Sequence, residues 1–171
     1  MQNQDKKKFI RNEILTLTIN GGLGRCKTYK PNINPKQKKH FNIFLRNRLE
    51  YYGKYYYKTI SNDQHIKNIT LLTKEISNNF HRILYNDKFR IGCAQKLLNL
   101  YLKYLWSLSI IPEPPHCPID EKIIRKIGLN ISWTKIDRID EYRKIIDKIK
   151  NVAKEKNLSI AKWELKEWRN E

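Results

Sequence analysis

The sequence predicts a mainly α-helical protein that folds as a single compact domain of five to seven helices. Three observations support this prediction. Apolar residues recur at helical spacing along most of the chain, and Pro, Gly and Asn-Asp pairs interrupt the pattern at short intervals. A length of 171 residues with 40% hydrophobic residues suits one domain with a real core, and no internal repeat or linker-like segment divides it.

The N-terminal part is the least regular in pattern. Residues 14–19 alternate weakly between apolar and polar types, which fits either a short strand or a helix. Glycines at 21, 22 and 24 indicate a turn or loop, and Pro31 and Pro35 extend the irregular stretch. We therefore expect an irregular basic N-terminal segment over residues 1–35, followed by a helical domain over residues 36–171.

Six further segments have helical patterns. Ser61 is a typical helix-capping residue, the pair at 86–87 interrupts the following apolar stripe, and Gly128 suits the position just past a helix end. The expected helices cover residues 36–60, 61–85, 90–108, 119–127, 137–155 and 159–168.

The charge of the chain is its strongest functional signal. The formal net charge is +18, from 35 basic and 17 acidic residues, and the first 60 residues alone contain 14 basic and three acidic ones. Such a surplus favours a polyanionic partner, with nucleic acid first and an anionic membrane second. An AT-rich genome would also enrich lysine, but it does not explain why acidic residues are scarce.

Cationic residues in the expected helix over 36–60 alternate with tyrosines at 51, 52, 55, 56 and 57. Aromatic rings among cations suit base stacking and phosphate neutralisation. The alternative is that the tyrosines straddle core and surface, with their hydroxyls in water. The candidate nucleic-acid contacts in this helix are Lys38, Lys39, Arg46, Arg48 and Lys54.

The three cysteines, Cys26, Cys93 and Cys117, are odd in number and irregular in spacing. They argue against a disulfide framework and for a reducing compartment. No apolar run follows the lysines at 6–8, and no window reaches bilayer-spanning length. We expect a cytoplasmic protein with no membrane, metal or cofactor. The tryptophans at 106, 133, 163 and 168 are expected to pack, although a binding platform is the alternative.

The segment over residues 90–127 could contain a reactive site. Lys96, Asn99 and Lys103 lie on one stripe of an apolar helix, and a proline-rich turn then presents Asp120 at the start of the next helix. A lysine in apolar surroundings can act as an amine nucleophile, and a nearby carboxylate can stabilise positive charge. A solvated stripe followed by a helix-capping aspartate would give the same pattern.

Residues 88–128 resemble the helix-hairpin-helix DNA glycosylases, particularly the 8-oxoguanine branch. The run from Gly92 to Lys96, GCAQK, is similar to the family's G-x-G-x-K hairpin. The run CPID, which ends at Asp120, is similar to its catalytic aspartate segment. The resemblance departs from the pattern at Ala94 and Gln95, which replace the second glycine and the residue before the lysine.

The resemblance implies a helix-hairpin-helix element and a base-excision DNA glycosylase/lyase. Lys96 would attack the sugar C1′ of a flipped nucleotide to form a Schiff base, and Asp120 would assist base departure. Gly92, Gln95, Asn99 and Lys103 would join the nucleic-acid contacts, with DNA favoured over RNA. Two alternatives stay open: a non-catalytic basic helical module, in phage defence or a larger assembly, and a helical protein-interaction partner.

Overall fold

A computed structural model describes residues 2–169, with side chains described for residues 4–168. This part of the chain contains seven α-helices and three short 3-10 helices, which confirms the predicted fold class. The elements are α1 (Gln2–Leu23), α2 (Pro35–Gly53), η1 (Lys54–Tyr57), α3 (Asn62–Phe80), η2 (Tyr85–Asp87), α4 (Ile91–Ser107), α5 (Glu121–Lys126), η3 (Trp133–Lys135), α6 (Ile139–Glu155) and α7 (Ile160–Arg169).

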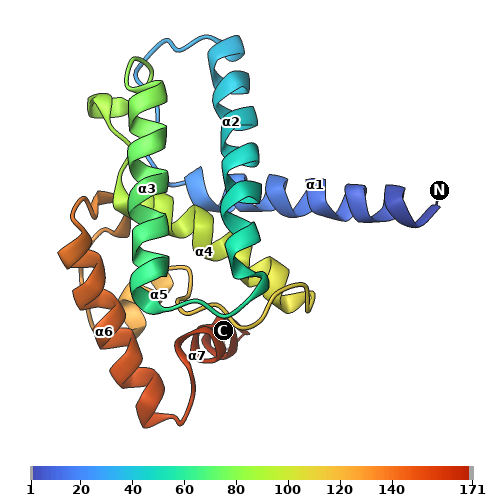
Figure 1. Ribbon diagram of the computed structural model, residues 1–171. Coiled ribbons are helices and arrows are strands. Elements are labelled where there is room, and N and C mark those ends of the chain that lie inside the picture. Colours follow the sequence, from blue (N-terminus) through green and yellow to red (C-terminus); the bar gives the residue numbers. More distant parts are fainter. Residues whose placement is uncertain (1, 170–171) are drawn as a thin grey trace.

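Helix α4 is the centre of the fold. It contacts α1, α2, α3 and α6, and every residue from 91 to 99 is buried. Figure 1 shows α2 and α3 standing side by side in front of α4, with α6 and α7 toward the end of the molecule where α2 connects to α3. A helix enclosed on all sides must satisfy its polar side chains internally, and this requirement shapes the candidate site.

Local capping explains why α2 and α3 begin where the sequence predicted. Asn34 Oδ1 accepts a hydrogen bond from the Gln37 amide at 2.9 Å, and the Gln37 side chain accepts one from the Asn34 amide at 3.3 Å. The Ser61 hydroxyl oxygen likewise accepts from the Gln64 amide at 3.2 Å. Each cap satisfies amides that have no partner within their helix, so both predicted starts are confirmed.

The expectation of an irregular segment over residues 1–35 is wrong for most of its length. Helix α1 covers residues 2–23 and includes Gly21 and Gly22. A Cβ at Gly22 would lie 2.5 Å from Leu97 Cδ2 of α4, so this glycine permits a close helix crossing. Glycine was interpreted as a turn signal, but here it serves packing. Within the described part of this segment, residues 2–35, it is residues 24–34 that lie outside the helices.

The expected hairpin over Gly92–Lys96 is also wrong, because all five residues belong to α4. The Gly92 amide donates to the Ile136 carbonyl at 2.9 Å. A Cβ at Gly92 would lie 2.0 Å from the Trp133 carbonyl oxygen. The glycine therefore seats η3 against α4, and its amide is not free to hold a phosphate.

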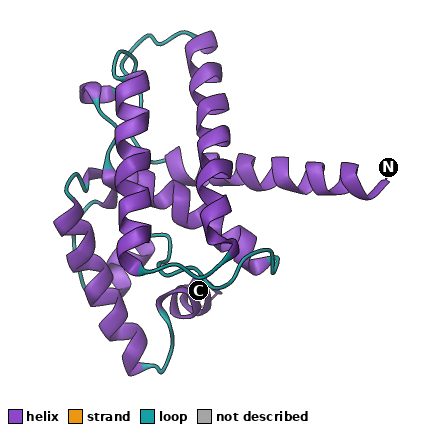
Figure 2. Ribbon diagram, in the orientation of Figure 1, coloured by secondary structure: helices purple, strands orange, loops and turns teal. Residues whose placement is uncertain are grey.

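The loop between α4 and α5 covers residues 108–120 and is drawn in teal in Figure 2. Its last part, residues 116–119, is buried, which is unusual for a loop because its peptide groups need internal partners. No helix in the described part of the chain has the length and apolarity needed to cross a bilayer.

Candidate functional site

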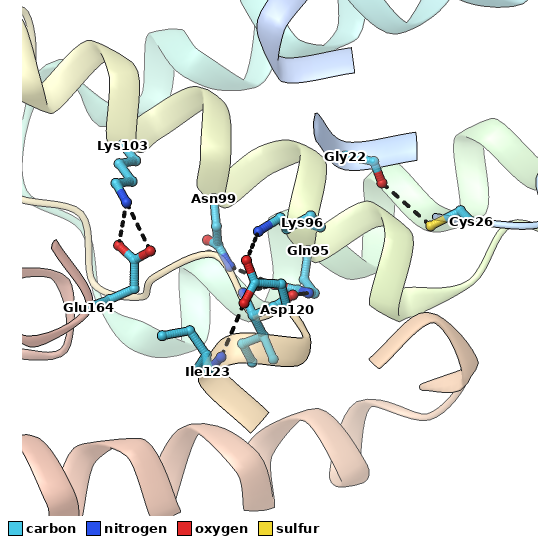
Figure 3. A network of polar contacts seen from close by, with 10 residues as sticks. Gly22, Cys26, Gln95, Lys96, Asn99, Lys103, Asp120, Ile123 and Glu164 are labelled. Atoms are coloured by element: carbon cyan, nitrogen blue, oxygen red, sulfur yellow. Dashed lines mark hydrogen bonds and ion pairs between the residues drawn. The ribbon is translucent and has the colours of Figure 1, made fainter. Parts of the chain in front are cut away.

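Lys96 and Asp120 meet in the structure. The Lys96 amine lies 2.7 Å from Asp120 Oδ2, and their side chains are only 8% and 16% exposed. Lys96 comes from the second turn of α4, and Asp120 is the N-cap of α5, where its Oδ1 accepts from the Ile123 amide at 3.1 Å. Figure 3 shows both contacts. The two residues proposed as amine and carboxylate therefore lie together, and the helix-capping alternative also holds for Asp120.

The neighbouring residue, Gln95, fixes how the two groups meet. Its side-chain amide donates to the Ile119 carbonyl at 2.8 Å, and its side-chain oxygen accepts from the Ile119 amide at 3.1 Å. Asn99 also donates to the Gln95 oxygen at 3.2 Å. Since Gln95 precedes Lys96 and Ile119 precedes Asp120, the clamp holds the loop in the register that pairs amine with carboxylate (Figure 3).

The ion pair lies in the wall of a pocket of about 630 Å³, formed by the end of α1, α4, α5, η3 and α7. Six of the side chains around it are charged, and the cations outnumber the carboxylates. The charged groups are Arg25, Lys96, Lys103, Lys122, Asp120 and Glu164. Volumes of about 300–1,000 Å³ are typical of ligand pockets.

A second ion pair lines the same pocket. The Lys103 amine lies 2.8 Å from the Glu164 carboxylate, and both side chains are at least four-fifths buried. Burial raises the pKa of Glu164 above its usual range, and the nearby Lys103 charge opposes this rise. The Lys103 amine also lies 4.9 Å from the ring centre of Trp168, a cation–π contact.

The structure divides the predicted nucleic-acid contacts of α2 into two groups. Lys38, Lys39 and Lys54 are exposed, as contact with a polyanion requires. Arg46 instead donates to Thr16 Oγ1 at 2.7 Å, and Arg48 pairs with Glu75 at 2.7 Å. These two arginines hold α1 and α3 against α2, so we remove them from the candidate interface.

Within α4, the prediction of surface contacts also needs correction. Gln95 and Asn99 are fully buried, and Gly92 is buried under η3. Asn99 was assigned to the surface because it lies on a polar helical stripe, and Gly92 and Gln95 because the resemblance placed them in a DNA-binding hairpin. That stripe faces a buried loop instead of solvent. Lys103 lines the pocket, so a ligand in the pocket can still reach it.

Sequence reasoning missed several pocket residues, among them Arg25, Lys122, Glu164 and Trp168. Trp168 was expected to pack in the core, whereas it is 52% exposed and lies over Lys103 and Lys122. Its neighbour in α7, Trp163, is 1% exposed and does pack. No pattern within α7 indicates that its outer face meets α4, since this depends on the long-range path of the chain.

The cysteines differ from expectation. Cys26, just after α1, forms a disulfide with Cys93 in α4, and Cys117 is a buried free thiol. Cys26 Sγ also lies 3.4 Å from the Gly22 carbonyl oxygen. The irregular spacing argued against a pairing because it says nothing about how α1 crosses α4. The disulfide ties the rim of the pocket to the helix that bears Lys96.

A buried polar network lies behind the ion pair. The Tyr56 hydroxyl is 2.6 Å from His65 Nδ1, and the Tyr142 hydroxyl is 2.8 Å from His116 Nδ1. The two histidine rings are in contact, with centroids 4.6 Å apart. Burial lowers the pKa of His65 to about 3, and burial followed by the charge of His65 lowers that of His116. The histidines are therefore neutral at pH 7.

No protein-family model, curated protein or solved structure matches the chain. Among the described residues, no group of three or more His, Cys, Asp or Glu side chains converges as a metal site would require. The resemblance to helix-hairpin-helix glycosylases accordingly stands on residues 88–128 alone.

Proposed function

We propose that the protein binds nucleic acid, DNA in preference to RNA, and acts as a glycosylase/lyase on a damaged or abasic nucleotide. The observation that carries the proposal is the Lys96–Asp120 pair, 2.7 Å apart in the wall of a cationic pocket. A catalytic amine and its carboxylate must reach one reacting centre, and these two do. A cytoplasmic location belongs to the same proposal. Thiols are kept reduced there, so Cys26 and Cys93 would face each other unbonded.

The chemistry assigns one role to each group. Lys96 Nζ forms a bond to the sugar C1′ while the C1′–base bond breaks, and the bonding electrons leave with the base. An amine attacks only when unprotonated, and Asp120 Oδ2 is the acceptor within reach of its proton. Asp120 passes this proton to the departing base, and the carboxylate that this regenerates stabilises the positive charge that develops at C1′. Opening of the sugar ring then gives the Schiff base.

The surroundings of the pocket favour a nucleotide. Arg25 is exposed at its edge, and the net charge of +18 draws phosphates toward the protein. Trp168 offers an exposed aromatic surface beside Lys103. A flipped nucleotide matches these features, since its phosphate suits the cations and its flat base suits the aromatic ring.

Borohydride trapping tests this proposal directly. The protein is incubated with duplex DNA containing 8-oxoguanine or an abasic site, then reduced, and covalent adducts are resolved on a denaturing gel. We expect an adduct with the wild-type protein and none with Lys96→Gln, while Lys144→Gln on the exposed face of α6 behaves as wild type. Circular dichroism confirms that each variant folds. The absence of an adduct with either substrate would refute the proposal.

A non-catalytic nucleic-acid-binding module, in phage defence or a larger assembly, is the second candidate. It is favoured by the exposed Lys38, Lys39 and Lys54 of α2 and η1 and by the surplus of cations in the first 60 residues. Its signature is duplex binding that weakens steeply with salt but is unchanged in Lys96→Gln. A shallow salt dependence would count against both candidates, because neither works without phosphate contacts.

A further inference from the structure

A second concave surface lies toward the N-terminal end of α1, and it shares no lining residue with the Lys96 pocket. It is a groove of about 1010 Å³ between the N-terminal half of α1, the end of α4 and η1. Figure 1 shows the N-terminal half of α1 extending well beyond the rest of the molecule. Residues 4–13 of this helix are all exposed, so the side of the groove that α1 forms is mostly open to solvent.

The floor of this groove, which we call the α1–α4 groove, is apolar. Ile10 and Ile14 lie on one face of α1, and Tyr101 and Leu105 lie on one face of α4, each pair separated by four residues. Ile14, Tyr101 and Leu105 are at most 8% exposed, whereas Ile10 is 46% exposed. An apolar floor that two helices form together has the form that receives a third helix.

The rim of the groove is cationic. Lys6, Lys7 and Lys54 are exposed along it. Arg11 pairs with Glu50, the one carboxylate that lines the groove. An occupant that neutralises this rim must therefore carry several negative charges beside an apolar surface.

We propose that the α1–α4 groove binds an amphipathic helical segment of a partner protein, apolar on one face and rich in Asp and Glu beside it. A second copy of this chain fits poorly, because two molecules of charge +18 repel each other. Nucleic acid presents phosphates and sugar to a groove and would leave the apolar floor uncovered. A concave floor likewise cannot insert into a flat membrane surface.

The state of α1 supports the same occupant. A helix half that extends into solvent has few tertiary contacts to stabilise it, and isolated helices of this length are marginal in water. Phe9 and Ile10 remain 62% and 46% exposed there. A partner helix in the groove would bury Ile10 and pack along α1, and the cations of the rim would meet its carboxylates.

The test uses a fluorescent synthetic peptide of about 15 residues, with leucines on one helical face and glutamates elsewhere, and measures anisotropy against the full-length protein. Two control peptides keep its length: one has lysine for every glutamate, and the other has the leucines scrambled around the helix. We expect saturable binding of the acidic amphipathic peptide alone.

Protein variants locate the binding. Ile10→Glu and Lys7→Glu should each lower the affinity for the acidic peptide by about tenfold or more. Leu71→Glu, which alters an exposed leucine of α3 outside the groove, should change affinity by less than about twofold. Equal affinity of wild type and Ile10→Glu, or equal binding of the scrambled peptide, would overturn the proposal. So would a DNA duplex or a phosphatidylserine vesicle that displaces the peptide and itself loses affinity in Ile10→Glu.

Discussion

The side chain of Gln95 satisfies both backbone groups of Ile119 inside the protein. A carboxamide offers a donor and an acceptor at once, which neither leucine nor an ionised glutamate does. Both partners belong to a buried loop that has no helix to satisfy its peptide groups. The Gln95 side chain therefore supplies the hydrogen bonds that a helix or strand would otherwise give to Ile119. By fixing Ile119 it also fixes Asp120, which follows Ile119 in the chain.

Gln95→Leu should lower the free energy of unfolding by about 2–5 kcal/mol, because it leaves two buried backbone groups without partners at about 1–3 kcal/mol each. Urea unfolding at pH 7 measures the change. Gln64→Leu is the matched control, since that half-buried side chain makes a single bond, to Asn68 at 2.9 Å. Equal losses in the two variants would contradict the clamp.

Asp120→Asn tests the buried ion pair. Asparagine caps a helix about as well as aspartate, so the change removes the charge while keeping the cap. It leaves the enclosed Lys96 amine uncompensated, and we expect a loss of about 3–5 kcal/mol in the free energy of unfolding. The double variant Lys96→Met/Asp120→Asn should be more stable than Asp120→Asn alone, because no unpaired charge remains.

The exposed pair Arg138–Asp140 is the control for this measurement, with side chains 66% and 54% exposed. Asp140→Asn should leave the free energy of unfolding nearly unchanged, because solvent screens this exposed pair. If Asp120→Asn is equally mild, the Lys96 amine is better hydrated than its 8% exposure indicates.

Lys96 and Asp120 were identifiable from sequence because an apolar helix and a stiff proline turn leave few places for a charge. Gln95 was misassigned because the resemblance placed it in a DNA-binding hairpin, and Asn99 because it lies on a polar stripe. A helical stripe of polar residues predicts solvent, but here the residues 116–119 cover it. Trp168 and Glu164 were missed because their approach to Lys103 depends on α7 folding back over α4, which no local pattern encodes.

The crossing of α1 and α4 depends on a glycine. An alanine Cβ at Gly22 would lie 2.5 Å from Leu97 Cδ2 and 3.3 Å from Leu97 Cα. Leu97 is itself fully buried, so the helices must separate to make room.

Gly22→Ala should therefore lower the thermal midpoint, at a cost of about 1–3 kcal/mol for overpacking, although alanine is the better helix former by about 1 kcal/mol. Asn20→Ala, on the exposed side of the same turn, should be neutral or slightly stabilising. Thermal unfolding followed by circular dichroism compares the two. A more stable Gly22→Ala would show that the crossing has room for a methyl group.

The disulfide Cys26–Cys93 joins the same two helices. It closes a loop of 67 residues, for which chain entropy predicts a stabilisation of about 4 kcal/mol. We expect a reducing agent to lower the unfolding midpoint of the oxidised wild type to that of Cys26→Ser. The midpoint of Cys26→Ser should not respond to reductant. If the reducing agent does not change the unfolding midpoint of the wild type, the two sulfurs do not form a bond in solution.

Helix boundaries were predictable where short-range chemistry sets them, as at Asn34 and Ser61, whose side chains cap the next helix. Helix α1 was not predictable in this way, because its apolar residues follow no clean stripe and its glycines indicate a turn. What keeps it helical is contact with α4, and tertiary contact overrides weak local propensity.

Across the protein, acid sensitivity should come from two sources with separate pH windows. The pKa of His65 is lowered to about 3, so between pH 6.5 and 3 the unfolded chain binds a proton that the folded chain does not, and stability falls with falling pH. Glu167 bonds to Lys126 and Lys156 at 2.7 Å each, which lowers its pKa to about 2. Its contribution is present above pH 4.5 and is lost from there toward pH 2.

Urea unfolding at pH 7.0, 5.5 and 4.5 separates these windows, because it covers the range of the histidines and stops above that of Glu167, while the raised pKa of Glu164 acts in the opposite direction. His65 alone should lower the free energy of unfolding by about 3 kcal/mol between pH 7 and pH 4, and His116, also lowered, should add to it. In His65→Gln, about one proton fewer should be taken up on unfolding, so the free energy of unfolding should depend less steeply on pH. The control is His40→Gln, at an exposed position, which should leave this slope unchanged. Parallel pH profiles for wild type and His65→Gln would mean that the buried pair takes up its protons without unfolding.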